Sequence, residues 1–527
     1  MRGTETLPSS LTVDQVEGSR PGASLRVTIE GAPSKARSCS VLLPHVGSGV
    51  HFTVSPPDVQ TIVRGLLERV FFCKDAQGKY RPPITPKRGA YSRLEGFKRK
   101  VTRGLIGSTK LTWEQFLGYY SGRKLTRYSN AVDSLTVCPL QRKDSYLDTF
   151  SKAEKDNRTA KPNPSPRCIQ PRHPRFNVEL GCYLKHVEHI LYHNIDAMFP
   201  GNHPVVMKSH NCDSRGAALS EAWGDIAHPV AVGLDAKRFD QHVSPEALGW
   251  EHSVYLRIYN QDPFLAKLLR WQMNNRGFVR CYNGTAQYTV KGSRMSGDMN
   301  TARGNVLIMC ALMWTYMGEL GIPYRFLNDG DDCVLIVSKR NLDRLESLVP
   351  WFSDMGFRME REPPVTVLEK VEFCQSQPVF DGRSYRMVRQ PRVALSKDLI
   401  TFLPVSAENQ WSSARRAIAE CGLALAGDMP VLGSFYKRLG LNTDHVRPNW
   451  GNQFPGSWYL ALGADHAHEP VTDEARYSFY LAFDITPDEQ IALERHIDAM
   501  PPPVYQTQWV DKSSENHSQV ITALLHQ

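Results

Sequence analysis

The chain has 527 residues, of which 41% are hydrophobic and 22% are charged, and its formal net charge is +9. This length excludes a peptide hormone, a small binding module and a disulfide-stapled toxin, and the composition excludes wholesale disorder and a polytopic membrane protein. The 11 cysteines form no CxxC pair, which argues against a zinc ribbon or a disulfide framework and favours a reducing compartment.

No segment has the pattern of a membrane span. The most apolar stretch, residues 304–318, is shorter than the ~20 apolar residues that a bilayer requires. The first residues, MRGTETLPSS, lack the apolar core of a signal peptide. We therefore expect a soluble or peripheral protein with no integral membrane segment.

Basic residues gather in the N-terminal half, after a first segment (1–85) whose Ser, Gly and Pro content predicts an extension with some strand. Eleven Lys and Arg lie in 87–127 against two acids, interleaved with aromatic residues, and seven more lie in 152–175. This mixture suits phosphate neutralisation with base stacking, although a solvated surface over a few core aromatics explains the first run as well. Acidic residues dominate 465–498, so we expect polyanions to bind the N-terminal half.

Apolar residues at helical spacing predict a helix over 181–195. One face of this helix carries Cys182, His186, His189 and His193, a spacing that can hold zinc. A polar helix face is the better interpretation, because no acid or cysteine pair nearby completes a recognisable metal set.

The second half alternates strand and helix signals. The apolar run 229–234 predicts a buried strand, and 244–246 (SPE) predicts the start of a helix, with an N-cap serine and a proline at the first position. Two β-rich runs, 324–327 and 333–337, flank 328–332 (NDGDD) and predict a hairpin with acids at its tip. The last third should be mainly helical, with a capped helix that begins at 486–489 (TPDE) and ends at 501–503 (PPP).

Three constellations of residues indicate chemistry. Asp235 and Asp240 follow the predicted strand, Asp331 and Asp332 follow a glycine at the hairpin tip, and 296–305 (SGDMNTARGN) leads into an apolar helix. The first spacing arises about once by chance in a chain of this length, the second ~0.1 times and the third about 0.006 times. Their joint occurrence in this order indicates a functional site.

The carboxylates of Asp235 and Asp331, on a strand end and a hairpin tip, are suited to sharing two hard cations. Oxygen ligands favour Mg²⁺ or Mn²⁺, and two ions ~3.5–4 Å apart stabilise both the attacking and the leaving oxygen of a phosphoryl displacement. A solvated turn is the alternative, but with Asp329 the tip holds three acids that repel one another unless cations or distance relieve them. Asp240 and Asn305 offer an acceptor and an amide that together can recognise a ribose 2′-OH.

These blocks resemble motifs A, B and C of the viral RNA-dependent RNA polymerases, and the flanking sequence is similar to the tombusvirus and carmovirus-like group. The flanking stretches are 144–147 (DSYL), 152–155 (KAEK), 167–179 (RCIQPRHPRFNVE), 372–375 (EFCQ) and 477–483 (YSFYLAF), the last shortly before a Thr-Pro pair. The resemblance covers roughly residues 90–500, and we recognise none in residues 1–80.

The resemblance implies an α+β fold in the form of a closed right-hand polymerase with fingers, palm and thumb. The expected division is an N-terminal extension at 1–85, fingers with part of the palm at 86–228, a palm at 229–380 and a mainly helical thumb at 381–527. A fingers segment at about 260–292 is expected as an insertion in the palm.

The resemblance also implies roles for single residues. Catalysis and the binding of two Mg²⁺ ions, with Mn²⁺ as an alternative, fall to Asp235 and Asp331, assisted by Asp332. The ribose pocket consists of Asp240, Ser296, Thr301 and Asn305. The basic residues that line the nucleotide entry path, where a triphosphate needs several fixed cations, are Lys152, Lys155, Arg167, Arg172 and Arg175; surface arginines are the alternative for any one of them.

Two further positions stay open. Phe373 and Cys374 fall where a primer-grip hairpin is expected, but a packing role explains them equally well. The lysine that often acts as a general acid in motif D has no clear counterpart. Arg358 lies nearest, and arginine is a poor proton donor because its pKa exceeds ~12.

By the same resemblance, the chain is an RNA-directed RNA polymerase that replicates and transcribes a positive-strand RNA virus genome by two-metal nucleotidyl transfer. The implied partners are RNA template and product, NTPs, a viral auxiliary replication protein and, through that protein, host membranes. The implied location is the host cell cytoplasm, peripheral to membrane-bound replication complexes. Members often carry an upstream membrane-anchoring region that this sequence lacks, so we expect that a partner supplies it or that Met1 starts a partial product.

Two other function classes remain. A reverse transcriptase or DNA polymerase shares the acidic palm, but Asp240 with Asn305 favours ribonucleotides, and extension with rNTPs or dNTPs on one RNA template distinguishes them. A non-catalytic RNA-binding or virion protein explains the basic half but not Asp235 with Asp331, and metal-dependent incorporation distinguishes that case.

Overall fold

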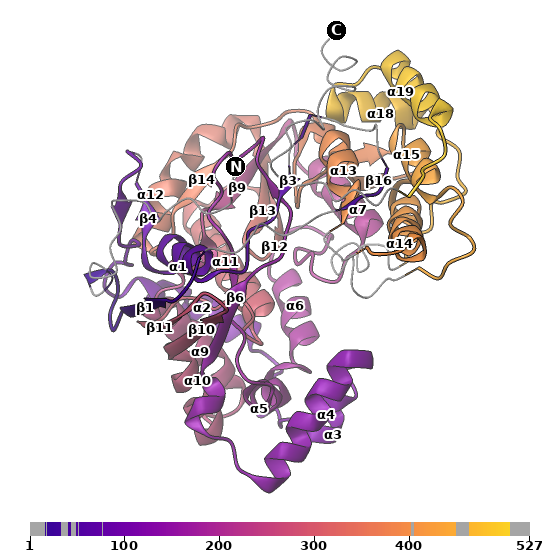
Figure 1. Ribbon diagram of the computed structural model, residues 1–527. Helices are drawn as coiled ribbons and strands as arrows, with labels where there is room; N and C mark the ends of the chain where they lie inside the picture. The colour runs from indigo at the N-terminus through magenta and orange to yellow at the C-terminus, as the bar shows by residue number, and fades with distance from the viewer. Residues whose placement is uncertain are drawn as a thin grey trace.

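The structure is a computed structural model that describes residues 16, 18–32, 40–43, 49–50, 52–75, 77–401, 405–448 and 463–505. Helices and strands are mixed along the chain, as expected for an α+β protein. Figure 1 shows two sheets with helices packed around them and a separate cluster of helices formed by the C-terminal part.

A four-stranded antiparallel sheet lies at the centre, in the order β12-β13-β9-β14. Its strands are β9 (Pro229–Ala236), β12 (Tyr324–Asp329), β13 (Asp332–Ser338) and β14 (Met359–Arg361). Successive residues of β13 enter different cores: Leu335 and Val337 one, Val334 and Ile336 the other. Both faces of the sheet are therefore buried, which explains why its strands are continuously apolar.

Helices cover both faces of this sheet. The first core includes residues of α2 (Glu95–Val101), α9 (Pro245–Ile258), α10 (Pro263–Met273), α11 (Thr301–Leu320) and α12 (Leu348–Asp354). The second core joins α7 (Cys212–Gly224) to the C-terminal helices. The hairpin predicted over 324–337 is confirmed as β12–β13, and Ser244 caps α9 as expected, by accepting a hydrogen bond from the backbone of Ala247.

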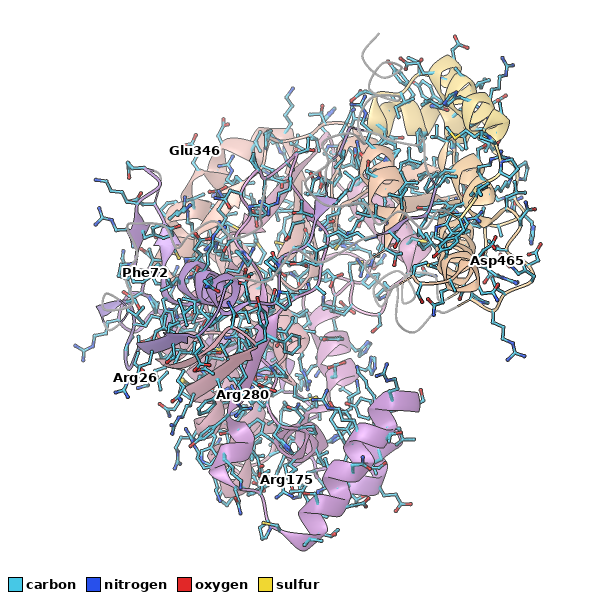
Figure 2. The ribbon with its side chains drawn as sticks, in the orientation of Figure 1. Arg26, Phe72, Arg175, Arg280, Glu346 and Asp465 are labelled. Carbon is cyan, nitrogen blue, oxygen red and sulfur yellow. The ribbon has the colours of Figure 1, made fainter. Side chains whose placement is uncertain are left out.

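A five-stranded sheet has the order β1-β11-β10-β6-β8. Its strands are β1 (Ser24–Ile29), β11 (Gly284–Lys291), β10 (Asn274–Cys281), β6 (Leu147–Ser151) and β8 (Cys168–Ile169). Helix α1 (Val59–Leu66) contributes to the core beneath the sheet, with Val279 and Tyr288 from the strands. Arg26 on β1 and Arg280 on β10 are labelled in Figure 2.

The N-terminal region is tied to three later parts of the chain. Besides β1, the short strand β2 (Ser40–Val41) pairs with β17 (Ile400–Thr401), and β3 (Phe52–Thr53) pairs with β7 (Asp156–Asn157). A local ribbon joins β4 (Cys73–Lys74) to β5 (Tyr80–Arg81). The predicted strand content of this region is therefore confirmed.

The helix predicted over 181–195 is wrong in one respect, because two helices cover this range: α5 (Pro174–Leu184) and α6 (Glu188–Asp196). The carbonyl oxygens of Tyr183 and Leu184 accept hydrogen bonds from Tyr259 and Arg303, respectively. In a continuous helix these two carbonyls accept from the backbone N–H groups four residues on, so side chains of other elements bind the chain at the point where the helix is interrupted.

The remaining elements complete the two ends of the molecule. Helices α3 (Trp113–Leu117) and α4 (Gly122–Val137) pack on α5 and extend away from the sheets (Figure 1). The hairpin of β15 (Ser376–Phe380) and β16 (Tyr385–Arg389) precedes a helical part that confirms the expected helical end: α13 (Pro391–Asp398), α14 (Glu408–Ala426), α15 (Leu432–Gly440), α18 (Asp473–Phe483) and α19 (Pro487–Ala499). The capping box at Thr486 is confirmed, and α19 ends before the predicted prolines.

Short 3₁₀ or π segments join several of these elements: Leu67–Phe71, Ala90–Leu94, Arg142–Ser145, Lys339–Ser347 and Leu368–Lys370. No helix in the described ranges combines the length and the apolar character needed to cross a bilayer. The division into extension, fingers, palm and thumb stays a prediction. Parts of the expected extension, including 1–15, and the parts of the expected thumb at 402–404, 449–462 and 506–527 lie outside the described residues.

Candidate active site

The acidic residues of two motifs meet on neighbouring strands. In the antiparallel register of β9 and β13, Asp235 faces Asp332, and across the hairpin Asp332 faces Asp329. Gly330 and Asp331 form the tip, where Gly330 adopts a φ of +90° that suits glycine. The sheet therefore brings Asp235, Asp331 and Asp332 to one edge, as the sequence predicted.

Burial and mutual repulsion act on these carboxyl groups. Burial, with Asp331 and Asp329 nearby, raises the pKa of Asp332 to about 6. Burial, with Glu360 and Asp331, also raises the pKa of Asp235. A cation at this edge would relieve the repulsion that these shifts reflect.

The described residues contain no cluster of three or more His, Cys, Asp and Glu side chains arranged as a metal site. Mg²⁺ is commonly held by one or two carboxylates together with substrate phosphates rather than by an all-protein cage. The donor set at this edge, oxygen-only and negatively charged, fits such an ion.

Asp329 differs from its neighbours because the protein itself neutralises it. Lys208 and Arg215 form ion pairs with its carboxylate, and despite burial they hold the pKa of Asp329 below its usual value. Sequence reasoning missed both partners, since nothing in the stretch around Lys208 and Arg215 distinguishes them from surface cations. Asp329 therefore adds less repulsion at the tip than three neighbouring acids in the sequence suggested.

Asp332 is also held by the backbone of the turn after 372. The N–H of Cys374 donates to Asp332 Oδ2 at 2.9 Å, and Cys374 and Gln375 both have positive φ, 53° and 58°. The turn closes by hydrogen bonds between the backbones of Phe373 and Ser376, and Phe373 is buried in the second core. The structure thus gives Phe373 a packing contact and Cys374 a contact with the acidic edge, while their primer-grip role stays a prediction.

The predicted ribose pair is in direct contact. Asn305, in the first turns of α11, donates through Nδ2 to Asp240 Oδ1 at 2.8 Å. Asp240 lies on α8 (Phe239–His242), the short helix that follows β9, and burial raises its pKa although the hydrogen bond from Asn305 opposes this shift. Helices from the first and third constellations therefore meet beside the hairpin.

Ser296 lies in the loop before α11, and Thr301 is the first residue of that helix. Thr301 donates its hydroxyl to the carbonyl of Met295 at 3.1 Å, and the carbonyl of Ser296 accepts from the backbone of Gln170 at 2.6 Å. Both contacts fix the loop on the protein, and a nucleotide contact by either side chain stays a prediction.

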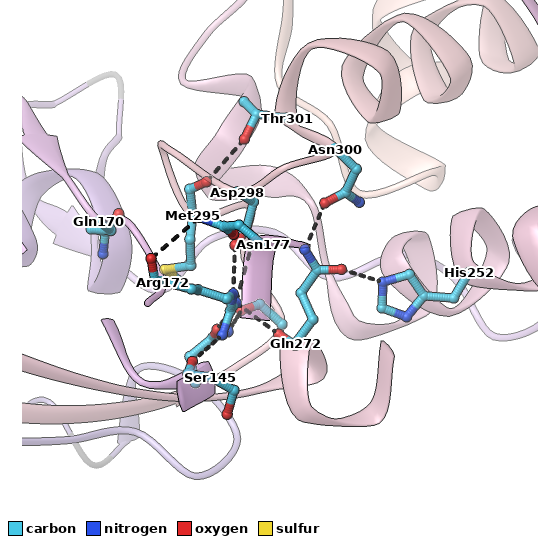
Figure 3. A network of polar contacts seen from close by, with 12 residues as sticks. Ser145, Gln170, Arg172, Asn177, His252, Gln272, Met295, Asp298, Asn300 and Thr301 are labelled. Carbon is cyan, nitrogen blue, oxygen red and sulfur yellow. Dashed lines mark hydrogen bonds and ion pairs between the residues drawn. The ribbon is translucent and has the colours of Figure 1, made fainter. Parts of the chain in front are cut away.

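The five basic residues fall into two groups. Arg172 is 1% exposed, pairs with Asp298 at 2.6 Å and donates to Asn275, while Arg175 pairs with Asp144 at 3.2 Å. Figure 3 shows Arg172 beside Asp298 within a network of polar contacts. Acceptors of the protein itself bind both guanidinium groups. Arg172 therefore stabilises the loop around Asp298, and Arg175 stabilises the start of α5.

The other three basic residues lie nearer to solvent. Lys152 and Arg167 share Glu154, with 40% and 52% of their side chains exposed, and Lys155 donates to the carbonyl of Lys397. Arg167 acts electrostatically on Asp240. Lys161, which sequence reasoning missed, likewise acts on Asp235. The positive charges of Arg167 and Lys161 thus oppose the raised pKa values of Asp240 and Asp235, respectively.

The structure also bears on two secondary points from the sequence, the alternative zinc site and the general acid. The zinc alternative gains no support, because His186 contacts the hydroxyl of Tyr259 and the described residues show no metal cluster there. Arg358 donates to the carbonyl of Lys74 and lies 3.7 Å from Glu360. The identity of a general acid stays open.

Comparisons with known proteins show which family the chain resembles. Residues 26–503 match the family model described as viral RNA dependent RNA polymerase. The RNA-directed RNA polymerases of Melon necrotic spot virus and Turnip crinkle virus are each 43% identical, over 86% of this chain and 58% and 59% of their own lengths. That of Tobacco necrosis virus (strain A) is 42% identical over 90% of this chain and 65% of its own length.

The chain thus spans about three fifths of these relatives. The tombusvirus and carmovirus-like resemblance is confirmed, but its expected start near residue 90 is wrong, because the match begins at residue 26, within β1. The chain belongs to the viral RNA-dependent RNA polymerase family.

Proposed function

We propose that the chain is the polymerase part of an RNA-directed RNA polymerase that replicates and transcribes a positive-strand RNA virus genome. The observation that supports this most is the meeting of Asp235, Asp331 and Asp332 at one sheet edge beside the Asp240–Asn305 pair. Carboxylates for cations and a polar pair for a ribose hydroxyl are the groups that ribonucleotide transfer needs.

In this proposal Asp235 and Asp331 hold two Mg²⁺ ions, with Mn²⁺ as a substitute, and Asp332 assists. When bound, the ions supply charge stabilisation for the attacking and leaving oxygens of an in-line displacement. The protein contributes orientation: the β9–β13 register sets the carboxylates, Cys374 fixes Asp332, and Asn305 with Asp240 holds the ribose. Arg167, Lys152 and Lys155 attract the triphosphate, assisted by Lys161.

The proposed architecture is the closed right hand, with the four-stranded sheet as palm, the five-stranded sheet within the fingers and α14, α15, α18 and α19 in the thumb. The proposed ligands are RNA template, RNA product and NTPs. We also propose a viral auxiliary replication protein that brings the chain to host membranes, so that it acts in the cytoplasm at membrane-bound replication complexes. Flotation with membranes, in the presence and absence of that protein, tests this last point.

Synthesis from a short RNA template with labelled NTPs tests the activity. Asp331→Asn should lower synthesis by orders of magnitude, because it removes transition-state charge stabilisation of several kcal/mol. It should leave RNA affinity unchanged and raise the Mg²⁺ concentration needed for the remaining activity.

The matched control is Asp343→Asn, which changes the same functional group at an exposed position away from this edge. Its synthesis should equal that of the unchanged protein. Near-normal synthesis by Asp331→Asn would contradict the metal assignment, and template-dependent incorporation of dNTPs in preference to NTPs would favour the reverse transcriptase alternative.

A further inference from the structure

A fully buried ion pair lies directly behind the ribose pair. Arg294, in the loop before α11, pairs with Glu251 on α9, and both side chains are 0% exposed. Nothing in the proposed chemistry uses either charge. Burying a charge pair away from water costs free energy that the attraction alone often fails to recover, so its position calls for a local reason.

Arg294 determines how the amide of Asn305 faces. Its Nε donates to Asn305 Oδ1 at 3.1 Å. Arginine has no acceptor, so the atom of Asn305 that faces it must be the oxygen. The amide nitrogen is then directed to Asp240, where it donates at 2.8 Å.

The backbone of Arg294 holds the other member of the ribose pair. Its N–H donates to the carbonyl of Asp240 at 2.9 Å, and the hydroxyl of Ser293 donates to the same carbonyl at 3.3 Å. Arg294 thus contacts Asp240 through its main chain and Asn305 through its side chain. A shift of this one residue would move both groups of the pocket.

Glu251 is itself fixed by other elements. Asn300, the residue before α11, donates to Glu251 Oε1 at 2.6 Å, and Tyr255 donates to the same oxygen at 2.7 Å. Figure 3 shows the continuation of this network, in which Gln272 donates to Asn300 and contacts His252. The carboxylate therefore has little freedom to follow a displaced arginine.

Gly304 leaves the space in which the pair lies. A Cβ at this position would overlap both Arg294 Nη2 and Glu251 Oε1. Gly304 is an interior residue of α11 with no positive φ, where alanine is the better helix former. α11 therefore has a residue of low helix propensity at the position where a side chain would displace the ion pair.

We propose that Arg294, held by Glu251, is a positioning residue for sugar selection, which orients Asn305 toward Asp240 so that the pocket accepts a ribose and rejects a deoxyribose. This inference rests on the proposed function of Asp240 and Asn305. A site built to hydrogen-bond a hydroxyl rejects the analogue that lacks it only while its own polar groups are held in place.

The test compares kcat/KM for an NTP with that for the matching dNTP on one RNA template, with Asn305→Ala as the reference variant. Asn305→Ala should lower the NTP/dNTP ratio by roughly 10-fold. The neutral double variant Glu251→Gln/Arg294→Met removes the pair without leaving an unpaired buried charge, and it should lower the ratio by a similar factor. Adding Asn305→Ala to it should lower the ratio little further, because coupled residues are not additive.

Two single variants separate orientation from folding. Arg294→Lys keeps the charge opposite Glu251 but lacks the rigid fork that reaches both partners, and Gly304→Ala displaces the pair without changing any charge. Both should lower the ratio while the circular dichroism spectrum and RNA affinity stay unchanged. The control double variant Arg386→Met/Asp428→Asn removes another buried pair, on β16 and after α14, and should leave the ratio unchanged.

The outcomes distinguish a failure of the positioning role of Arg294 from a failure of the ribose pocket itself. If Asn305→Ala lowers the ratio but the folded Glu251, Arg294 and Gly304 variants stay within about twofold of the unchanged protein, the positioning role is overturned and the ribose pocket stands. If Asn305→Ala itself leaves the ratio unchanged, the ribose pocket is overturned, and the positioning role with it. A ratio lowered equally by the Arg386/Asp428 control would make the effect a general consequence of lost stability and would also overturn the positioning role.

Discussion

His252 lies at the far end of the polar network that begins at Arg294. Its ring is buried on α9 and contacts Gln272 Oε1 at 3.2 Å. Because Gln272 uses its amide nitrogen for Asn300, its oxygen must be the acceptor, and His252 is the donor. Burial, with Arg294 adding to it, lowers the pKa of His252 to about 4.

This shift predicts a loss of stability in acid. An unfolded histidine has a pKa near ~6.5, so between that value and about 4 the unfolded chain binds a proton that the native chain does not. The free energy of unfolding should therefore fall as pH falls through this window, by up to ~1.4 kcal/mol per pH unit for this residue.

Urea unfolding of the protein between pH 7 and pH 4.5 measures the effect. His252→Gln keeps a donor but does not titrate, so its unfolding free energy should fall less steeply on acidification than that of the unchanged protein. His189→Gln, at an exposed position, is the control. Equal slopes for the protein and His252→Gln would contradict the prediction.

Single residues differ in how far the sequence could reveal them. The proximity of Asp235 to the hairpin acids and that of Asp240 to Asn305 were predictable from the spacing of the motifs: the register places Asp235 opposite Asp332, and a hydrogen bond joins Asn305 to Asp240. Their roles in phosphoryl transfer and ribose recognition stay predictions. Glu251 and Gln272 lie on helices before the motif and are ordinary polar residues in the sequence.

Arg172 shows what the sequence left out. The resemblance implied a place on the nucleotide entry path, which stays a prediction, and the structure adds a partner that the sequence did not reveal, Asp298, 126 positions later in the chain. Charge counts describe a segment, whereas the partner of one guanidinium depends on tertiary contacts that a count does not contain.

At the scale of elements, the helices α2 and α4, which carry residues of the basic segment 87–127, differ in how their basic side chains are placed. On α2, Lys98 pairs with Glu95 and donates to Ser253, and Lys100 lies over the ring of Trp314. On α4, which extends from the body of the molecule (Figure 1), the exposed basic residues are Arg123, Lys124 and Arg127. The expected phosphate contacts of the segment therefore shift from α2 toward α4.

This difference predicts unequal effects on RNA binding. Replacing Arg123, Lys124 and Arg127 with Gln should flatten the slope of log affinity against log salt by up to ~2 units, at ~0.7 for each phosphate contact on a single strand. Replacing Lys98, Arg99 and Lys100 with Gln should change the slope less, because the Lys98 side chain is only 15% exposed and α2 packs against α6 and α11 in the body of the molecule.

Binding of a labelled single-stranded RNA at several salt concentrations measures both triple variants under the same conditions. Each removes three positive charges, so a general loss of net charge affects them equally. A larger change of slope for the α2 variant would contradict the interpretation. No change of slope for either variant would favour the alternative that the whole segment is a solvated surface.

Element boundaries were predictable where the signal is local. The start of α9 at Ser244 and the capping box at Thr486 depend on residues within one helical turn, and both are confirmed. At the break between α5 and α6, the carbonyls are bound by Tyr259 and Arg303, which are 76 and 119 positions away in the chain. No window of local sequence contains that information.

At the scale of the whole molecule, the N-terminal strands join parts that are distant in sequence. β1 forms the edge of the five-stranded sheet beside β11, while β2 pairs with the strand that precedes α14. The family match begins at residue 26, within β1. We therefore expect the N-terminal region to be an integral part of the fold that holds the five-stranded sheet together.

Leu25 offers a direct test. It is 5% exposed and packs in the third core with α1, whereas the adjacent Arg26 is exposed on the same strand. Leu25→Ala should lower the free energy of unfolding by ~2–5 kcal/mol, the usual cost of removing a buried leucine side chain, and Arg26→Ala should lower it by less than ~0.5 kcal/mol.

Hydrogen exchange locates the effect within the molecule. β11 pairs with β1 on one side and β10 on the other, so loosening β1 should accelerate exchange of those β11 amides that donate to β1. Amides of β12 and β13, which belong to the other sheet, should keep their protection, because stability is not uniform across a chain with several cores. If Leu25→Ala accelerates exchange equally in both sheets, the molecule unfolds as one cooperative unit; if it accelerates exchange in neither, β1 contributes nothing to holding the sheet, and the N-terminal region is an extension after all.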